Sequence, residues 1–566
     1  MSVIVGVHDG HNASVAVVRD GRIELALQEE RITRIKNQGD APAGAAKLAF
    51  EVFTGDCAQV RVALNGLYMN YNQWQKETIL RDYERSADLV GRWKQPFKGT
   101  FVDRAYQKRK ADQRVDALSA IGIVKERIET VEHHLAHASA AYHTAPWRDE
   151  RVLVLTCDGS GDRLSATVNI GERGVLSRIA SVSEHDSIGR LYALVTRHLG
   201  MVPLEHEYKV MGLAPYVSRG GGMESVARDF SSLFDFTSDG LAWKRRTGVP
   251  SMYAAYGFLK DLLAGKRFDT IAAGAQKFVE DMLVKWVSNA VRETGIRKIA
   301  CAGGVFMNVK ANLALLEIPE VEDLYVFPSC GDESNSIGAA CHLAARAGDR
   351  IQPLGALYYG KPITDREAQL VLNSIASARV RFRWVPDIEC VTAEKLAEGK
   401  IVARAKGGVE FGARALGNRS ILARADSPTA VREINEMIKN RDFWMPFAPS
   451  VLADRAKDYY EKPKPVSSPY MMFGFRSRPE RRASFAAAQH PHDFTTRPHE
   501  VTEEHNADYY RLLKEYEART GEGILLNTSF NLHGEPIVYR ANDAVNVFLR
   551  SGLAYMALGN WWVEKT

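Results

Sequence analysis

The amino-acid sequence predicts an α/β protein made of two large domains. Three observations support this prediction: the length of the chain, the alternation of apolar strand-like runs with helical segments, and a strand–turn–strand arrangement that occurs twice in the first half. A chain of 566 residues allows two to four domains, at roughly 100–200 residues per domain. Its 45% hydrophobic and 25% charged residues are typical of a globular protein and exclude a disordered or fibrous chain.

The first strand–turn–strand arrangement lies at the N-terminus. We expect a buried strand over residues 3–7, a turn over 9–12, a second strand over 14–18, a hairpin turn at Asp20-Gly21 and a third strand over 23–27. These elements together predict a β-meander.

The second arrangement repeats this order after residue 150. A strand over 151–156 precedes a turn at Asp158-Gly-Ser-Gly-Asp162, a strand over 164–170, a turn over 171–174 and a strand from Val175. The two stretches resemble the halves of the actin, sugar-kinase and Hsp70 superfamily (ASKHA), which clasp a nucleotide. Asp-Gly is also a common hairpin turn, so one copy alone would not separate the two interpretations.

Further elements complete the first domain. Residues 67–114 carry many aromatic and basic side chains and are expected to form a helical insertion, either over an acceptor pocket or as a simple solvated face. Residues 299–312 predict a buried strand, a turn at Gly303-Gly304 and a helix start, where backbone N–H groups can approach an anion. A strand over 324–327 and a small-residue helix from Ile337 follow. Glycine and proline between 355 and 362 place the boundary near 355, giving domains 1–355 and 356–566.

Charge and cysteine usage narrow the class of protein. The net charge is only +5, which argues against a nucleic-acid-binding protein. The six cysteines contain no Cys-x-x-Cys pair, so neither a disulfide framework nor a thiolate zinc site is expected. No signal-peptide core or membrane-length apolar run is present. We therefore expect a cytoplasmic protein with no membrane partner.

The first chemical motif is a pair of histidines at helical spacing. His133 and His137 lie four residues apart in an alanine-rich helix and share one face, although one such pair is near the chance expectation. Asp158 and Asp332 each follow a buried strand, and such strand ends gather at one edge of an α/β sheet. Each aspartate is equally suited to a turn or a helix N-cap. Together the four side chains suit iron, manganese or zinc, and their types do not select among these metals.

The second motif is a group of cations in the second half. Arg414 and Arg419 lie in a glycine-containing loop, and Lys439, Arg441 and Arg497 follow. Guanidinium forks bind phosphate oxygens in pairs and lysine adds a compact charge, so this group suits polyphosphate or carbamoyl-phosphate chemistry. The Asn527-Thr-Ser529 turn, after an apolar strand over 524–526, offers small polar groups to the same ligand.

Ordered motifs along nearly the whole chain resemble the O-carbamoyltransferases of natural-product pathways, such as those acting on tobramycin, cephalosporins and Nod factors. These motifs are His11-Asn-Ala-Ser14, Glu29-Glu-Arg31, His133-His-Leu-Ala-His137, Asp158-Gly-Ser-Gly-Asp162, Glu207-Tyr-Lys-Val-Met-Gly-Leu-Ala-Pro215, Gly303-Gly-Val, Gly331-Asp332, Gly412-Ala-Arg-Ala-Leu-Gly-Asn-Arg-Ser420 and Asn527-Thr-Ser-Phe-Asn531.

The resemblance implies a fold and a reaction. It implies an N-terminal domain of the threonylcarbamoyl-transferase type, related to the ASKHA superfamily, and a C-terminal YrdC-like domain with a twisted sheet. In that family the YrdC-like domain converts carbamoyl phosphate and ATP into carbamoyl adenylate, releasing pyrophosphate and phosphate. The N-terminal domain then transfers the carbamoyl group to an alcohol and releases AMP. Carbamoyl phosphate, ATP with Mg and a small-molecule alcohol are therefore the expected partners, and a homodimer is expected from relatives.

The resemblance also implies roles for individual residues. His11 matches the base that deprotonates the acceptor hydroxyl, and the metal, iron in preference to manganese or zinc, is held by His133, His137, Asp158 and Asp332. The implied catalytic and ligand-binding residues of both domains are Arg414, Lys439, Arg419, Arg497, Asn527, Ser529, Gly303, Gly304, Asn308, Glu207 and Lys209.

The chain departs from the family pattern at two positions. Ala413 stands where many relatives have proline, and Met445 stands where many have a phosphate-binding arginine. The loss of that cation puts one phosphate contact in doubt unless Arg441 or another basic side chain replaces it.

Three alternative functions have less support in the sequence. A threonylcarbamoyladenosine-type tRNA-modifying enzyme needs an RNA-binding surface, for which a net charge of +5 gives no support outside residues 67–114. A hydrogenase-maturation carbamoyltransferase would carry Cys-x-x-Cys motifs. A non-enzymatic nucleotide-binding scaffold is disfavoured by the cations of the second domain, with Met445 the one point in its favour.

Overall fold

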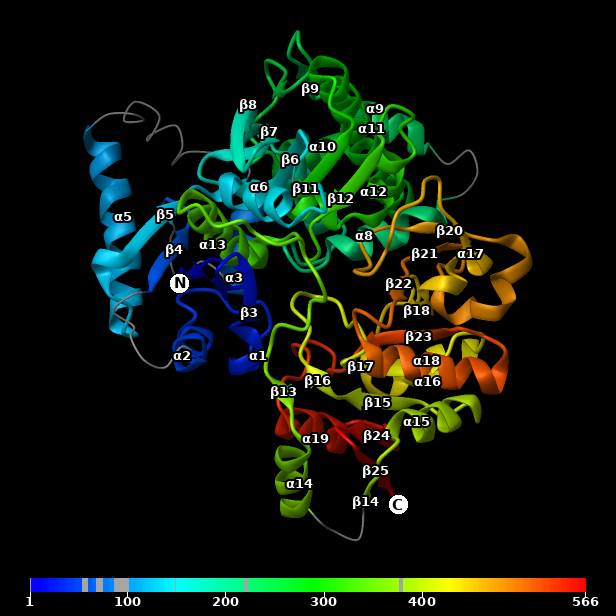
Figure 1. Cartoon of the computed structure of the whole chain (residues 1–566). Helices are drawn as coiled ribbons and strands as arrows, with labels where there is room; N and C mark the ends of the chain where they lie inside the picture. Colours follow the sequence, from blue (N-terminus) through cyan, green and yellow to red (C-terminus); the bar gives the residue numbers. More distant parts are fainter. Residues whose placement is uncertain are drawn as a thin grey trace. The chain divides into compact units, whose positions relative to one another are not determined.

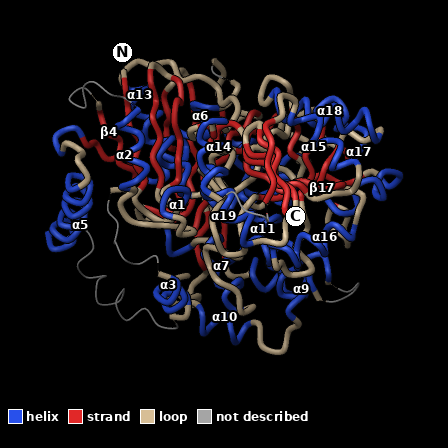
Figure 2. The backbone as a smooth tube through the Cα atoms, turned by 90° about the horizontal axis from the view of Figure 1, so that it is seen from below, coloured by secondary structure: helices blue, strands red, loops and turns tan. Residues whose placement is uncertain are grey.

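The computed structural model describes residues 2–52, 60–67, 75–85, 101–147, 149–217, 222–375 and 380–566 (Figure 1). Helices and strands alternate throughout, which confirms the α/β class (Figure 2). The chain forms two compact units. The first contains Met1–Glu29 and Asn37–Leu354, and the second contains Glu30–Lys36 and Gly355–Thr566. The expected boundaries, 1–355 and 356–566, did not assign the N-terminal segment Glu30–Lys36 to the second unit.

The first sheet of unit 1 contains the expected N-terminal meander. Its strand order is β3-β2-β1-β4-β5. β2 pairs antiparallel with both β1 and β3, whereas β4 runs parallel to β1 and to β5. The strands are β1 (Val3–His8), β2 (Ser14–Arg19), β3 (Arg22–Gln28), β4 (Arg61–Asn65) and β5 (Ile128–Val131).

The second sheet has the same pattern of order and direction. It runs β12-β11-β6-β7-β8, with β7 antiparallel to β6 and β8 and with β11 parallel to β6 and β12. The strands are β6 (Val152–Gly161), β7 (Leu164–Glu172), β8 (Val175–Ser183), β11 (Lys298–Ala302) and β12 (Asp323–Val326).

The expected turn over residues 158–162 is wrong in detail. β6 continues to Gly161, and pairing with β7 is interrupted between Cys157 and Gly161. Three residues of β6 therefore face a single residue of β7, an irregularity of the bulge type that re-aims side chains. The tight turn itself is confined to Asp162 and Arg163, which have φ of 47° and 71°.

Two helices lie between these sheets (Figure 1). α13 (Asn335–Arg346) packs on β1, β2 and β4, and α6 (His133–Thr144) packs on β6, β7 and β11. The two helices also pack on each other. Their approach depends on glycine, because a Cβ on Gly338 would lie 1.9 Å from the Ala136 carbonyl oxygen. Likewise, a Cβ on Gly6 of β1 would lie 1.8 Å from the Ser336 carbonyl oxygen.

The remaining elements of unit 1 surround this core. They are α2 (Ala43–Val52), α3 (Lys76–Tyr83), α5 (Phe101–Ala120), α7 (Ile188–His198), α8 (Glu207–Leu213), α9 (Met223–Ser231), α10 (Tyr256–Leu262), α11 (Phe268–Thr294), α12 (Val309–Leu316), β9 (Phe234–Phe236) and β10 (Trp243–Arg245). Within the expected insertion over residues 67–114, α3 and part of α5 are described. Residues 68–74 and 86–100 lie outside the described residues.

Unit 2 is built on an eight-stranded mixed sheet in the order β14-β25-β24-β15-β17-β23-β18-β22. Aliphatic and aromatic side chains of β15, β17, α15 (Ile388–Ala397) and α18 (Ala507–Thr520) are part of its core. The strands of this sheet are β14 (Val380–Trp384), β15 (Val402–Ala405), β17 (Arg419–Arg424), β18 (Ala448–Leu452), β22 (His499–Val501), β23 (Ile524–Ser529), β24 (Tyr555–Leu558) and β25 (Trp561–Lys565).

The other elements of unit 2 are short strands and helices. The helices are α1 (Glu30–Thr33), α14 (Asp365–Ser374), α15 (Ile388–Ala397), α16 (Pro428–Ile434), α17 (Ala456–Tyr459), α18 (Ala507–Thr520) and α19 (Ala541–Arg550). The strands are β13 (Pro362–Ile363), β16 (Gly407–Gly408), β19 (Tyr460–Glu461), β20 (Phe475–Ser477) and β21 (Thr495–Thr496).

In the part of the chain that the structure describes, no helix is both long and apolar enough to cross a lipid bilayer. The cysteines described are all free thiols, and four of them are buried: Cys157, Cys301, Cys330 and Cys341.

The first prediction concerns the contribution of the α6–α13 contact to stability. Replacing Gly338 by alanine forces a methyl group into the Ala136 carbonyl, so the helices must separate. We expect G338A to destabilise the protein by about 1–3 kcal/mol, measured as a lower urea midpoint by circular dichroism. Gly355→Ala is the control, because a Cβ there meets nothing within 4 Å. Equal midpoints for the two variants would contradict the prediction.

Candidate functional site

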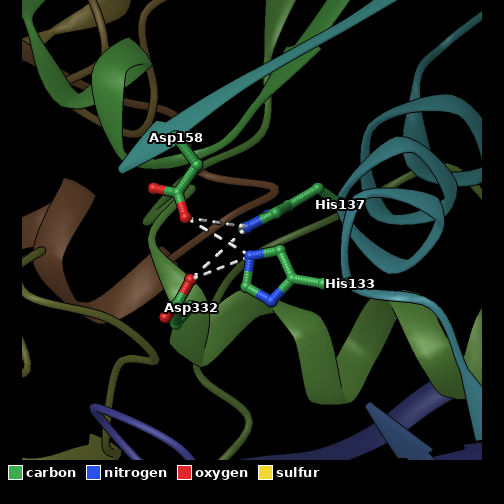
Figure 3. Close-up of side chains that lie close together, drawn as sticks. All are labelled: His133, His137, Asp158 and Asp332. Atoms are coloured by element: carbon green, nitrogen blue, oxygen red, sulfur yellow. Dashed lines mark hydrogen bonds and ion pairs between the residues drawn. The ribbon is translucent and has the colours of Figure 1, made fainter. Parts of the chain in front are cut away.

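The four expected metal ligands form one cluster in unit 1 (Figure 3). Their ligand atoms all lie within 4.8 Å of one another. The Nε2 atom of His133 is 3.3 Å from Asp158 Oδ2 and 3.5 Å from Asp332 Oδ1. The Nε2 atom of His137 is 4.0 Å and 3.5 Å from the same two oxygens. Both histidines are buried, whereas both carboxylates are partly exposed.

Local structure explains why these side chains meet. Glu132 caps α6 by accepting hydrogen bonds from the backbone N–H groups of His134 (3.1 Å) and Leu135 (2.8 Å), so His133 and His137 lie on consecutive turns from the first residue of the helix. Asp332 lies just before α13, and Asp158 lies in the irregular part of β6. The packing of α6 on α13 therefore brings the four side chains to one point.

Electrostatics keep the carboxylates ionised. Burial favours the neutral acid at Asp158, but the hydrogen bond from His133 and the charge of His137 outweigh it and hold the pKa of Asp158 well below its usual value. At His133, burial opposes protonation, yet the charges of Asp332 and Asp158 raise its pKa to about 9. Two charged carboxylates thus face the two imidazoles.

This arrangement fits a divalent cation. Ligand atoms about 2.1 Å from one ion lie about 3.0–3.4 Å apart at right-angled or tetrahedral positions, and three of the four imidazole–carboxylate distances are 3.3–3.5 Å. The Oδ1 atom of Asp332 is buried and has no hydrogen-bond partner among the described residues. A nitrogen and carboxylate donor set suits iron, manganese and zinc alike.

The glycine turn next to the cluster holds one ligand in place. Gly304 donates its N–H to Asp158 Oδ1 at 3.0 Å. Gly303 has φ of 104°, and a Cβ there would lie 2.3 Å from the Cys157 carbonyl oxygen, so only glycine fits. Asn308 caps α12, with its side chain accepting from Ala311 N–H at 3.1 Å. The described contacts of these residues are with the protein, and their ligand contacts stay a prediction.

The turn that carries His11 lies next to the cluster. His8 accepts a hydrogen bond from Asn65 at Nδ1 (2.9 Å), and its Nε2 is 3.0 Å from the His11 carbonyl oxygen. Burial lowers the pKa of His8 to about 4, and the charge of Asp332 is close enough to oppose this shift. The role of His11 as a base stays a prediction, since it is the His11 carbonyl, and not its ring, whose contact is described.

Two buried arginines of unit 1, one in an ion pair and one between two aromatic rings, were missed by the sequence analysis. Arg114 of α5 forms a bidentate pair with Asp9, at 2.9 and 2.6 Å. Arg190 of α7 lies between the rings of Tyr83 and Tyr253, 4.2 and 4.0 Å from their centroids. Neither partner of these arginines is a neighbour in sequence, so spacing could not reveal them.

Glu207 and Lys209 lie on α8. The side chain of Glu207 accepts from Leu204 N–H at 2.7 Å, and burial raises its pKa to about 7. A group that titrates near neutral pH is suited to proton transfer. The ligand roles expected for both residues stay predictions.

Unit 2 contains the expected cations as a group of neighbours. Lys439 is buried, and its Nζ donates to Ser529 Oγ (3.1 Å) and to Asn531 Oδ1 (2.7 Å). Arg441 donates to Thr528 Oγ1 at 3.1 Å. We call Lys36, Arg414, Lys439, Arg441 and Arg497 the cation cluster.

The cation cluster is electrostatically strained. Burial, together with the charges of Arg441 and Lys36, holds the pKa of Lys439 well below its usual value. Burial and the charges of Arg414 and Arg441 do the same to the pKa of Arg497. Among the described residues, the charges acting on these two groups are all positive. The Nε atom of Arg497 is also buried without a hydrogen-bond partner in that part of the chain. An anion is the ligand that would relieve this repulsion.

The expectation for Arg419 is wrong. Its side chain is fully buried in β17, and its guanidinium donates to the carbonyl oxygens of Tyr539 (3.1 and 2.9 Å), Gly407 (3.1 Å) and Asn418 (2.9 Å). These donors are used within the protein, so Arg419 supports the loop instead of binding phosphate. Glu410 also supports this loop, because its Oε1 accepts from the N–H groups of Leu416, Asn418 and Arg419 at 2.8–3.2 Å.

The expected Asn-Thr-Ser turn is the end of a strand. Asn527, Thr528 and Ser529 belong to β23. Asn527 donates to Ala415 O (3.0 Å) and Ser450 Oγ (2.8 Å), while its Oδ1 is buried without a partner among the described residues. Met445 stands where many relatives were expected to have a phosphate-binding arginine. Its backbone N–H donates to Asp442 O at 3.0 Å. Arg441, four residues earlier, belongs to the cation cluster and is the side chain that could replace the missing positive charge.

Family comparisons agree with this architecture. The carbamoyltransferase N-terminus model matches residues 3–341 and the carbamoyltransferase C-terminus model matches residues 393–565. The chain therefore belongs to the carbamoyltransferase family, which is a class of transferases.

Several full-length relatives are similar to the chain. Uncharacterized protein MJ1051 of Methanocaldococcus jannaschii is 30% identical over 100% of both chains. Nodulation protein NolNO of Sinorhizobium fredii is 29% identical, covering 98% of this chain and 79% of its own length. Nodulation protein U of Bradyrhizobium diazoefficiens is 27% identical over 94% and 92%. Among solved structures, HypF of T. kodakarensis aligns with 62% of this chain and 48% of its own at 12% identity and a TM-score of 0.33.

The second prediction concerns metal binding at the candidate metal centre. Removing an imidazole ligand leaves three donors, so His137→Ala is expected to lower the affinity for iron, manganese or zinc by at least about 100-fold. The measurement is metal content by mass spectrometry after reconstitution and dialysis. His198→Ala, at the end of α7 and outside the cluster, should retain the metal. Equal metal content in both variants would overturn the assignment.

The third prediction concerns proton uptake when an anion binds to the cation cluster. An anion bound near Lys439 stabilises its charged form and raises its low pKa, so binding should take up protons. Affinity for inorganic tripolyphosphate should therefore fall as pH rises toward the ordinary pKa range of lysine. Calorimetry in buffers of different ionisation enthalpy measures the uptake, and Lys439→Met should reduce it. Proton release on binding would contradict the argument.

Proposed function

We propose that the protein is an ATP-dependent O-carbamoyltransferase with two active sites. Unit 2 would consume carbamoyl phosphate, ATP and one water molecule: water releases phosphate from carbamoyl phosphate, and a carbamate oxygen then bonds to the α-phosphorus of ATP as pyrophosphate leaves, which gives carbamoyl adenylate. Unit 1 would transfer the carbamoyl group to the hydroxyl of a small-molecule natural product and release AMP. The observation that carries this proposal is the cation cluster, whose buried Lys439 and Arg497 face only positive charges among the described residues.

In unit 2, the chain's own groups account for ligand binding. Arg414, Arg441 and Arg497 supply planar guanidinium donors for phosphate oxygens, and Lys439 supplies a compact charge. Ser529 and Asn531 hold Lys439 from one side through its Nζ. Two charged phosphoryl ligands repel each other in solution, so a cluster of cations favours their approach.

In unit 1, the group of two histidines and two aspartates would hold the metal. When bound, a divalent cation neutralises charge on adenylate phosphate oxygens and makes AMP a better leaving group. The chain orients its ligands: Gly304 N–H donates to Asp158 Oδ1, and Ser334 Oγ lies 3.5 Å from His137 Nδ1. The Nε2 atom of His137 faces the two carboxylates and also lies 3.2 Å from Asn335 Nδ2, a contact that a bound metal would replace. We propose His11 as the base that accepts the proton of the acceptor hydroxyl.

The finer fold assignment belongs to the same proposal. We assign unit 1 to the ASKHA type because its two sheets share one strand order, 3-2-1-4-5 in each half, and carry α6 and α13 between them. We assign unit 2 to the YrdC-like type on the resemblance of its motifs. Carbamoyl phosphate, ATP with Mg and an alcohol are the proposed partners, with iron as the proposed metal.

The fourth prediction tests the reaction and the division of labour. The protein should form AMP from ATP only when carbamoyl phosphate is present. Lys439→Ala should lower this rate by at least about 100-fold, since phosphate positioning in unit 2 is lost. His11→Ala should still form the adenylate and fail at transfer. Nucleotides are measured by chromatography and acceptor mass by mass spectrometry.

Lys457→Ala is the matched control, because Lys457 is an exposed lysine of unit 2 in α17. It should behave as the wild type. ADP as the product, or AMP formation independent of carbamoyl phosphate, would overturn the adenylate route. Loss of the same step in the Lys439 and His11 variants would overturn the two-site assignment.

A further inference from the structure

Asp162 is the last residue of the Asp158–Asp162 motif, and the proposed reaction gives it no function. It lies in the turn between β6 and β7, where its backbone has φ of 47°. This left-handed conformation is costly for a residue with a side chain, whereas glycine adopts it freely. The contacts of the side chain account for a residue other than glycine at this position.

The carboxylate of Asp162 holds the backbone of a candidate metal ligand. Its Oδ2 accepts from the N–H of His133 at 2.8 Å. His133 is the first residue of α6, and N–H groups in the first turn of a helix have no partner within the helix. Glu132, the N-cap, accepts from the next two N–H groups, whereas Asp162 holds the residue that carries the imidazole. The start of α6 is therefore fixed by the β6–β7 turn as well as by its own cap.

The neighbouring glycine fixes the place of the His133 ring. A Cβ on Gly161 would lie 2.2 Å from both Cγ and Cδ2 of His133, so the ring packs directly on the backbone of β6. The ring Nε2 lies 3.3 Å from Asp158 Oδ2 in the same segment (Figure 3). One short segment, Asp158–Asp162, therefore contacts His133 at its backbone, its ring carbons and its ring nitrogen.

The same carboxylate also binds the chain at the end of β4. Leu67 N–H lies 3.0 Å from each carboxylate oxygen of Asp162, so Oδ2 accepts from both Leu67 and His133. Leu67 is the first residue of the expected insertion. The last residue of the insertion, Arg114, donates to the carbonyl oxygen of Gly66 at 2.6 Å. Both ends of the insertion therefore meet at the end of β4, which Asp162 joins to His133.

We propose that Asp162 is a positioning residue of the metal centre, and that it couples the imidazole of His133 to the backbone of Leu67, where the insertion begins. The inference rests on the proposed function in one respect, the binding of a divalent cation by the cluster. Asp162 is not one of the four candidate ligands, so it acts on the metal through His133.

This coupling acts in both directions. A metal that fixes the imidazole of His133 also restrains its backbone N–H, and hence the carboxylate that accepts from both His133 and Leu67. The hydrogen bond of Leu67 should then open less often when the metal is bound. Leu67 is 45% exposed, so this hydrogen bond, and not burial, protects its amide from exchange. By reciprocity, loss of the carboxylate weakens metal binding.

The test uses Mn²⁺ and the full-length protein, because electron paramagnetic resonance measures unbound Mn²⁺ directly. Asp162→Gly removes the carboxylate and leaves a backbone with φ of 47° free of strain. It should lower the affinity for Mn²⁺ by about tenfold or more. Asp162→Asn retains an oxygen acceptor and tolerates the same backbone conformation, so its affinity should stay within about threefold of the wild type.

Amide exchange measures the coupling separately from the affinity. At saturating Mn²⁺, hydrogen–deuterium exchange at Leu67 should slow by at least about fivefold in the wild type and should not change in Asp162→Gly. Mass spectrometry with residue-level fragmentation follows this amide. A residue that only stabilises the fold would alter exchange equally with and without metal, so it would not produce this difference.

Asp20→Gly is the matched control. Asp20 also lies in a hairpin turn, with φ of 45°, and accepts one backbone N–H, that of Ser2, at 2.8 Å. This variant should bind Mn²⁺ as the wild type does. Wild-type affinity in Asp162→Gly would refute the inference. Exchange at Leu67 that does not respond to Mn²⁺ in the wild type would refute it too, and that measurement requires no variant to fold.

The results also separate this inference from the proposed reaction. If Asp162→Gly loses affinity while the wild type forms no AMP with carbamoyl phosphate, the inference stands and the carbamoyl reaction fails. If the wild type transfers the carbamoyl group while Asp162→Gly keeps its affinity for Mn²⁺, only the inference fails. A wild type that binds no Mn²⁺ would refute the metal centre and this inference together.

Discussion

The close packing of α6 on α13 is the contact on which the metal centre depends. Gly338 allows α13 to approach the Ala136 carbonyl of α6, and Gly6 allows β1 to approach α13. Larger side chains at these positions would separate the helices. His133 and His137 come from α6, whereas Asp332 lies in the turn just before α13, so these side chains meet only if the two helices touch. Asp158 joins them because β6 is irregular at that point and Gly304 N–H holds its carboxylate. Four candidate ligands from three parts of the chain are thus placed by backbone packing.

In unit 2, too, the surrounding backbone fixes the candidate site, but there the grouped side chains all carry the same charge. There the side chains that we propose to bind the ligand are buried beside other positive charges, and the surrounding structure supplies the stability. Glu410 gathers three backbone N–H groups of the loop that carries Arg414, and Arg419 satisfies carbonyl groups of the same region. With that scaffold fixed, Lys439 and Arg497 can remain buried against other cations. In the proposed function, repulsion among them favours an anion, because a bound phosphate would remove a cost that the free protein bears.

Several features were predictable because they depend on local sequence. The meander of β1, β2 and β3 follows from alternating apolar runs and an Asp-Gly turn, and the shared face of His133 and His137 follows from helical periodicity. Others were not predictable. Arg419 has the same glycine-containing context as Arg414, yet it is buried in β17, and only the position of the Tyr539 carbonyl decides its role. The pairing of Arg114 with Asp9 joins positions 105 residues apart, which no local pattern encodes.

By itself, the sequence determined the class of fold, and it singled out the four side chains of the candidate metal centre and the cations proposed to bind phosphate, since these depend on residue types and on short-range periodicity. The tertiary structure decided which cations are neighbours, which arginine is structural, and that Glu30–Lys36 belongs to unit 2. The physical reason is the distance along the chain over which each interaction acts. Periodicity and turn preferences act over a few residues, whereas the segment's place depends on hydrogen bonds from Arg31 and Arg34 to carbonyl groups some 380 and 500 residues away.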